Sequence, residues 1–170
     1  FWGGEVFKRE LLTAEAWVAV NSPAEWGGIV GCLQDNGSFE KGWVLGYNND
    51  KFNFALSTGG DLTYLNASDS FQTGRWYHVV GTYDGSLMRI YVNGTERGRS
   101  SNRRGTIDYS PAAFVIGCYL DDNEFYPLEG FISEVRLYNR ALTSQQVRTR
   151  YNRTKGSHTG RPKPPVALTN

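Results

Sequence analysis

Apolar and polar side chains alternate along much of this chain, most clearly between Arg75 and Gly94, in RWYHVVGTYDGSLMRIYVNG. Residues 76–83 and 88–92 each place every second side chain on one face, which is the period of a half-buried antiparallel strand. The pairs Asp-Gly at 84–85 and Asn-Gly at 93–94 readily adopt the positive φ angles of tight hairpin turns. The segment therefore predicts two strands joined by the first turn and closed by the second.

Similar short runs predict further strands on both sides of this hairpin. Each run is apolar or alternating and is bounded by Gly, Asn, Asp or Ser, which are common turn residues. Many short strands separated by turn signals are typical of an all-β fold, and we predict one antiparallel sandwich. The expected strands are 11–20, 26–32, 42–47, 52–56, 61–65, 112–118 and 128–138, with one more short strand in the polar, Arg-rich connection 95–110.

One helix and a tail are expected after the last strand. Thr143-Ser144-Gln145-Gln146 matches a capping box, which predicts a helix from there to about Tyr151. The sequence beyond it, KGSHTGRPKPPVALTN, is rich in proline and small polar residues, the composition of a linker. We therefore expect a sandwich domain over 1–152, a proline-rich basic linker or tail over 153–170, and neighbouring domains in a larger parent protein.

The 170 residues suit one domain, and their charge is nearly balanced, with 18 basic and 17 acidic residues. This balance gives no reason to expect a nucleic acid or a membrane surface as partner. No apolar run approaches the length of a membrane-spanning helix. The chain begins with Phe1 rather than Met, from which we expect a processed or excised piece of a larger protein.

The sequence does not decide whether its two cysteines, Cys32 and Cys118, are oxidised or reduced. A disulfide between them would close a long loop and suit a secreted domain. Two free thiols that pack as small apolar side chains are the alternative. A structural zinc site is not expected, because the only histidines, His78 and His158, lie in a predicted strand and in the tail.

Three segments carry a family resemblance in the expected order: EAWV at 15–18, the hairpin at 76–94, and EGFISEVRLYNRALTSQQV at 129–147. The chain resembles the laminin-G-like domains of the concanavalin A-like lectin/glucanase superfamily. It departs from their common pattern at Ser133, where Asp is usual. The resemblance implies a two-sheet antiparallel jelly-roll β-sandwich, related in shape to pentraxins. It also implies a secreted or cell-surface location, extracellular or periplasmic, and a domain that binds rather than catalyses.

Two loops rich in oxygen donors are candidates for a metal site, and they read CLQDNG at 32–37 and CYLDDNE at 118–124. Calcium takes six to eight oxygen ligands. Comparable loops of pentraxin-like relatives hold calcium, so the resemblance implies Ca²⁺ here. Ordinary turn chemistry uses the same residue types and is the alternative. The implied ligands are Asp35, Asn36, Asp121, Asp122 and Glu124.

A glycan site needs an aromatic ring against the C–H face of the sugar and paired polar groups for its hydroxyls. Six aromatic residues in or beside the two loops are candidates for stacking. Each of them has core packing or loop anchoring as its other explanation. These residues are Trp26, Trp43, Tyr47, Tyr119, Phe125 and Tyr126.

The predicted strands lack the spacing of catalytic carboxylates. A retaining glucanase needs two carboxylates about 5 Å apart, on the same face of a strand, whereas Glu129 and Glu134 are five residues apart and alternate faces. We predict a non-catalytic carbohydrate-binding or adhesion module of a larger secreted or surface protein, with a polysaccharide or glycan as partner. A protein-interaction or spacer module is the alternative, and a polysaccharide-degrading enzyme fits less well.

Overall fold

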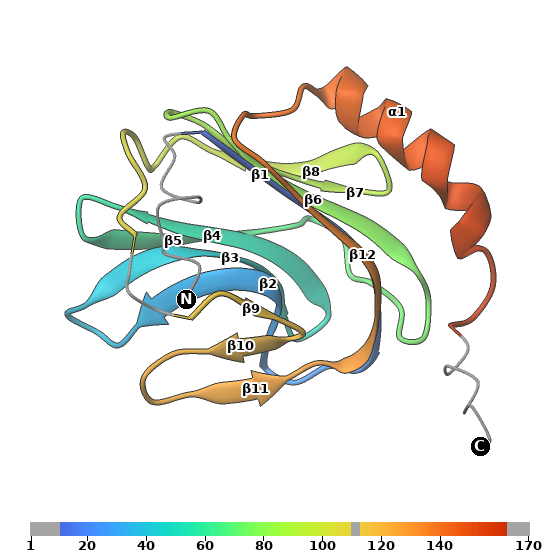
Figure 1. Cartoon of the computed structure of the whole chain (residues 1–170), viewed down its shortest axis with the longest axis horizontal. Helices are drawn as coiled ribbons and strands as arrows, with labels where there is room; N and C mark the ends of the chain where they lie inside the picture. Colours follow the sequence, from blue (N-terminus) through green and yellow to red (C-terminus); the bar gives the residue numbers. More distant parts are fainter. Residues whose placement is uncertain (1–10, 110–112, 163–170) are drawn as a thin grey trace, which may run out of the picture.

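The computed structural model describes residues 11–109 and 113–162, which form two facing antiparallel sheets, a small hairpin and a C-terminal helix (Figure 1). The predicted two-sheet antiparallel sandwich is thereby confirmed. The helix-side sheet has the order β12 (Glu129–Tyr138), β1 (Leu12–Ser22), β6 (Tyr77–Tyr83), β7 (Met88–Val92) and β8 (Thr95–Ser100). The hairpin-side sheet has the order β5 (Asp61–Asn66), β4 (Lys51–Thr58), β3 (Glu40–Asn48), β2 (Trp26–Asp35) and β9 (Val115–Ile116).

The core lies between the two sheets, where alternating residues of neighbouring strands meet. On β1, the side chains of Ala14, Ala16 and Val18 point inward, as their spacing predicts, and each is at most 1% exposed. The opposite sheet contributes large aromatic side chains, and burying such apolar area is the main favourable term of folding. Its largest core residues are Trp43, Tyr47, Phe52 and Phe54.

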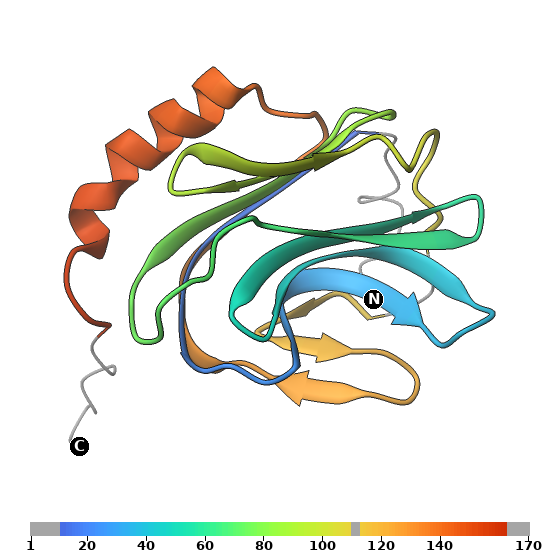
Figure 2. The same ribbon diagram turned by 180° about the vertical axis from the view of Figure 1, so that it is seen from behind.

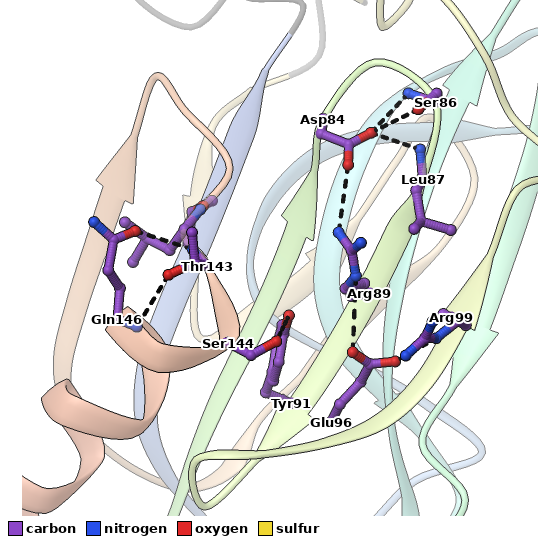
Figure 3. A network of polar contacts seen from close by, with 12 residues as sticks. Asp84, Ser86, Leu87, Arg89, Tyr91, Glu96, Arg99, Thr143, Ser144 and Gln146 are labelled. Carbon is purple, nitrogen blue, oxygen red and sulfur yellow. Dashed lines mark hydrogen bonds and ion pairs between the residues drawn. The ribbon is translucent and has the colours of Figure 1, made fainter.

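Both predicted turns of the central hairpins are present, with positive φ angles of 87° at Gly85 and 77° at Gly94. Figure 3 shows how a carboxylate holds the first turn. Asp84 Oδ1 accepts hydrogen bonds from the backbone amides of Ser86 and Leu87, at 3.1 and 2.9 Å. The turn is thus fixed by its own sequence, which is why local pattern alone predicts it.

Helix α1 (Ser144–Thr154) begins where the capping box predicts. Thr143 Oγ1 accepts from the Gln146 amide at 3.2 Å, and Gln146 Oε1 accepts from the Thr143 amide at 2.9 Å (Figure 3). A hydrogen bond of 3.1 Å between the hydroxyls of Tyr91 and Ser144 joins the start of the helix to β7.

The helix is longer than the sequence predicts, ending at Thr154 rather than near Tyr151, and a short 3₁₀ helix, η1 (Lys155–His158), follows it. Residues 153–158 were expected in the linker but are helical, and the His158 ring stacks on Trp17 with 4.0 Å between the ring centroids. The division into a domain and a linker beyond this segment stays a prediction.

The strand expected over 112–118 is interrupted. Residues 110–112 lie outside the described part of the chain, β9 covers only Val115–Ile116, and β10 (Cys118–Leu120) pairs with β11 (Phe125–Pro127) instead. Gly117 has a φ of 81°, a left-handed conformation that ends the extended backbone. The one predicted strand is therefore replaced by β9 and by the β10–β11 hairpin.

Cys32 and Cys118 are free thiols. Strand β9 pairs with β2 so that Ile116 lies opposite Val30, and the Cys118 backbone lies against Gly28. Cys32 is four residues farther along β2, roughly 13 Å away at the usual rise of a strand. A disulfide needs Cα atoms within about 7 Å, so the register favours the free-thiol alternative.

A buried carboxylate on β1 fastens α1 to its sheet. Glu15 is 2% exposed, and its oxygens bond to His78 Nε2 at 2.9 Å and to Arg150 Nε of the helix at 2.5 Å. Burial opposes ionisation of Glu15, but the hydrogen bonds from His78 and Arg150 outweigh it and hold the pKa below its ordinary value. The Trp17 indole N–H adds a second attachment, donating to the Thr154 hydroxyl at 2.9 Å.

We expect Glu15→Gln to lower the free energy of unfolding by about 3 kcal/mol at neutral pH, because Arg150 then loses its buried counter-charge. Since the folded-state pKa of Glu15 is depressed, its contribution is present above the unfolded-state pKa and is lost as pH falls through the folded-state value. Urea unfolding of both proteins at neutral and at strongly acidic pH measures this, and the difference between them should shrink in acid.

The matched control is Glu25→Gln, at an exposed glutamate in the connection between β1 and β2. Its effect on the free energy of unfolding should stay within about 0.5 kcal/mol. If Glu15→Gln were as stable as the parent at neutral pH, the carboxylate would not be the attachment of the helix.

Candidate functional site

The β10–β11 hairpin lies against the outer face of the hairpin-side sheet (Figures 1 and 2). Tyr119 of β10 is 4% exposed and packs on three apolar side chains of that face, Leu33, Val44 and Ala55. Half-buried aromatic side chains surround this contact, among them Tyr64 and Tyr126. We refer to this region as the hairpin face; it includes residues 32–37, which are the end of β2 and the start of the turn after it, and the loop at 121–124.

The two oxygen-rich loops of the sequence meet at the hairpin face. Asn36 Nδ2 donates to Asp122 Oδ2 at 3.3 Å, and the Asp122 amide donates to Gln34 Oε1 at 3.1 Å. The partners are 86 and 88 residues apart in the chain, so only the pairing of strands brings them together. Gln34 was not among the predicted site residues, and no local signal distinguishes it from any other loop glutamine.

Asp121 is committed to its own turn. This residue is 8% exposed, and its Oδ1 accepts from the amides of Asn123 and Glu124, at 3.0 and 2.8 Å. The other oxygen accepts from the Tyr119 hydroxyl at 3.2 Å. The carboxylate therefore shapes the loop that follows β10, which is an ordinary role for Asp in a turn.

Two further carboxylates hold tyrosine hydroxyls. Tyr64 donates to Asp35 Oδ2 at 2.8 Å, and Tyr126 donates to Glu124 Oε1 at 3.1 Å. Burial, followed by the neighbouring Tyr119 and Asp35, raises the pKa of Tyr64 far above its ordinary value, and the bond to Glu124 raises the pKa of Tyr126. Both hydroxyls thus stay protonated and act as hydrogen-bond donors.

Three of the six predicted stacking residues reach the surface. Trp26 is half-buried, with its ring 5.0 Å from that of Tyr64, and Tyr126 is half-buried with its ring 6.0 Å from that of Tyr119. Phe125 precedes Tyr126 in β11, so its ring points to the opposite side of the strand, where it is 62% exposed. Trp26, Tyr64 and Tyr126 form an aromatic rim next to the polar loops. Tyr64 was not among the predicted stacking residues.

The other three predicted stacking residues lie inside the protein. Trp43 and Tyr47 are 0% exposed and belong to the core between the sheets, so neither ring can meet a sugar. The prediction that these two rings stack on a sugar is wrong, because alternation along β3 turns both side chains inward. Tyr119 is buried as well and supports the rim from beneath.

The predicted calcium ligands are not gathered around one point. Among residues 11–109 and 113–162, no group of three Asp, Glu, His or Cys side chains is placed to hold a metal ion. Asp121 has both oxygens engaged, and Asp35 and Glu124 each have one oxygen engaged with a tyrosine. These side chains do not form a calcium site as they stand, and Ca²⁺ binding, which would require the loops to rearrange, stays a prediction.

Sequence comparison assigns the family. A profile of the concanavalin A-like lectin/glucanases superfamily matches residues 3–148. The chain belongs to this superfamily. The match includes all three segments on which the resemblance rests, and the resemblance is thereby confirmed.

Solved structures share the fold. The SAP-like pentraxin of Limulus polyphemus has a TM-score of 0.61 at 24% identity, over 83% of this chain and 69% of its own. Domain 4 of AbnA, an extracellular arabinanase of Geobacillus stearothermophilus, has a TM-score of 0.65 at 20% identity, over 85% and 68%. A candidate carbohydrate-binding protein of Bacteroides ovatus has a TM-score of 0.63 at 26% identity, over 82% and 40%. These likenesses confirm that the chain has a laminin-G-like, lectin-like jelly-roll fold.

Two characterised proteins also match over nearly the whole chain. Pappalysin-1 of Homo sapiens and that of Mus musculus are each 28% identical over 173 residues. These alignments cover 91% of this chain but only 10% of each pappalysin, so the chain spans about a tenth of the length of these relatives. Separately, no helix within the described residues has the length and apolar character to cross a membrane.

A calcium ion held by the two loops would raise the melting temperature by mass action, because it binds only the folded state. Thermal unfolding in millimolar Ca²⁺ and in chelator measures the shift. Asp122→Asn should abolish it, since this exposed carboxylate lies where the loops meet. Asp69→Asn, an exposed carboxylate paired with Arg97 elsewhere, should keep it. Equal melting temperatures with and without calcium would show that these loops do not bind calcium.

Proposed function

We propose that this chain is a non-catalytic carbohydrate-recognition module of a larger secreted or surface protein, and that the hairpin face is its glycan site. The observation that carries the proposal is the aromatic rim of Trp26, Tyr64 and Tyr126 beside the joined loops of Asn36 and Asp122. Aromatic faces suit the C–H face of a sugar, and amide and carboxylate groups suit its hydroxyls.

The comparisons supply support of a coarser kind. The AbnA domain that shares this fold is described in complex with arabinotriose, and the arabinanase is described as extracellular. The relative from Bacteroides ovatus is described as a candidate carbohydrate-binding protein. We propose a saccharide ligand and an extracellular location for this chain as well. The proposal rests on the shared fold and on the aromatic and polar groups of the hairpin face.

Catalysis is disfavoured by the way the acidic groups of the hairpin face are used. Fold neighbours include sialidase chains and an arabinanase domain, so the fold by itself is compatible with enzymes. In this chain, Asp35, Asp121 and Glu124 accept hydrogen bonds from tyrosine hydroxyls or backbone amides, which is a structural role. A general acid or nucleophile needs a carboxylate that is free to meet the substrate.

A protein-binding module is the second candidate, and one observation favours it. Phe125 is 62% exposed and Ile116 is 54% exposed, although both are large apolar side chains at the hairpin side of the molecule. Large apolar side chains that are exposed together mark candidate protein contacts. The glycan proposal rests instead on the polar loops, which an apolar protein contact would leave without partners.

Binding should be measured by calorimetry of the chain with neutral oligosaccharides, beginning with arabino-oligosaccharides, after a glycan-array screen. Affinity should be modest, because a shallow site buries little of a well-hydrated ligand. Trp26→Ala should weaken binding about tenfold, or ~1.4 kcal/mol, with little change in melting temperature, since the ring is only half-buried.

The matched control is Trp76→Ala, at a half-buried tryptophan that packs with Phe131 and His158 on the helix side. It should leave neutral-glycan affinity unchanged. Glycan binding that survives Trp26→Ala would place the site elsewhere. Silence across the whole glycan set, together with binding of a protein through Phe125, would replace the proposal with the second candidate.

A further inference from the structure

The near-neutral charge of the whole chain conceals a separation along the sequence. Residues 1–134 contain all 17 acidic residues and 10 basic residues, a net charge of −7. Residues 135–170 contain the other 8 basic residues and no acidic residue, a net charge of +8. A segment in which charges of one sign are concentrated attracts ligands of the opposite sign, even when the net charge of the whole chain is near zero.

The fold places the described part of this basic segment on one side of the molecule. Helix α1 and η1 cover the outer face of the helix-side sheet, and the β10–β11 hairpin lies at the opposite end of the sandwich in both views (Figures 1 and 2). Of the arginines carried by the helix, Arg150 is neutralised by Glu15, whereas Arg148 and Arg153 are exposed. The helix side is therefore cationic.

A cavity of about 460 Å³ opens beside the end of η1. Arg75 and Arg161 line it from two distant parts of the chain, and both side chains are exposed. Neither makes a hydrogen bond or ion pair with any residue in the described part of the chain. Two unpaired guanidinium groups on one cavity are the donors that carboxylate and sulfate groups prefer, since each guanidinium can bind in a bidentate manner.

The aromatic side of the cavity is held in place by stacking. His158 stacks on Trp17 at 4.0 Å and meets the Trp76 ring edge-on at 5.3 Å. The carbonyl of Thr154 can only accept, so His158 Nδ1 donates to it at 2.9 Å, and the Ser133 hydroxyl donates to Nε2 in the neutral ring. A wall fixed in this way loses little entropy when a ligand binds.

We propose that this cavity binds an acidic saccharide, with Arg75 and Arg161 holding a carboxylate or sulfate group and Trp76 facing the sugar ring. Thr73 supplies a hydroxyl partner, and the volume lies in the range of small-molecule pockets. A second cavity of about 290 Å³ lies along α1 and is lined partly by Arg140 and Arg153. It would hold a further anionic group of the same polysaccharide. The site is separate from the hairpin face and does not rest on the function proposed for it.

Calorimetry of the 170-residue chain with heparin, polygalacturonate, neutral dextran and polyglutamate tests the proposal. We expect heparin and polygalacturonate to bind at low salt and to weaken severalfold as the salt concentration rises, because the charges are exposed and screened. Arg75→Gln and Arg161→Gln should each lower the affinity roughly tenfold, as expected when a charge-assisted hydrogen bond is lost. Trp26→Ala should leave it unchanged.

The control is Arg104→Gln, which removes the same charge at an exposed arginine beyond β8. It should leave the affinity almost unchanged, and the melting temperatures of all three arginine variants should match the parent. Three outcomes would overturn the proposal: no binding of either acidic polysaccharide, an equal loss in Arg104→Gln, or equally tight binding of polyglutamate through Arg75 and Arg161. The last result would indicate an acidic protein segment as the ligand.

Discussion

Each sheet of a sandwich has two faces, and only one of them can lie in the shared core. In this chain the outer faces also carry apolar side chains, so each requires a cover of its own. The outer face of the helix-side sheet packs under α1 through Val147, and that of the hairpin-side sheet packs under β10 through Tyr119. The positions of the helix and of the small hairpin both follow from this requirement.

Polar anchors fix the two covers in different ways. The helix is held by the buried Glu15 carboxylate, which forms an ion pair with Arg150 and accepts a hydrogen bond from His78. The hairpin is held to β2 by hydrogen bonds from the Asp122 amide to Gln34 Oε1 and from the Gly117 amide to the Ile29 carbonyl. A buried carboxylate is costly unless it is fully paired, so the Glu15 anchor also selects one position for the helix.

The two candidate binding regions lie at the edges of these covers and differ in charge. Acidic and amide groups dominate the hairpin face, whereas the cavity beside η1 is lined by two arginines that have no ion-pair partner among residues 11–109 and 113–162. A neutral sugar would suit the first region and an acidic one the second, so one module could engage two kinds of saccharide. Total charge is a poor guide in such a case, because a ligand experiences only the charges within about a Debye length.

Local physics determined what the sequence could predict by itself. The turn at Asp84, the capping box at Thr143 and the alternation along β1 depend on neighbouring residues, and all three are present. Tertiary structure decided which face each aromatic residue occupies. Strict alternation places Trp26 with Val30 and Cys32, yet an irregularity between Gly28 and Val30 turns Trp26 outward toward Tyr64.

The meeting of distant segments was likewise beyond the sequence. Asn36 and Asp122 are joined across 86 residues, and Arg75 and Arg161 line one cavity from two separate segments. The break at Gly117, which sends the chain into the β10–β11 hairpin, is what places Asp122 near Asn36. The sequence alone determined the sandwich, its turns and its helix start, because those interactions are short in range. The sites were decided by strand register and by packing over long distances, to which local patterns do not respond.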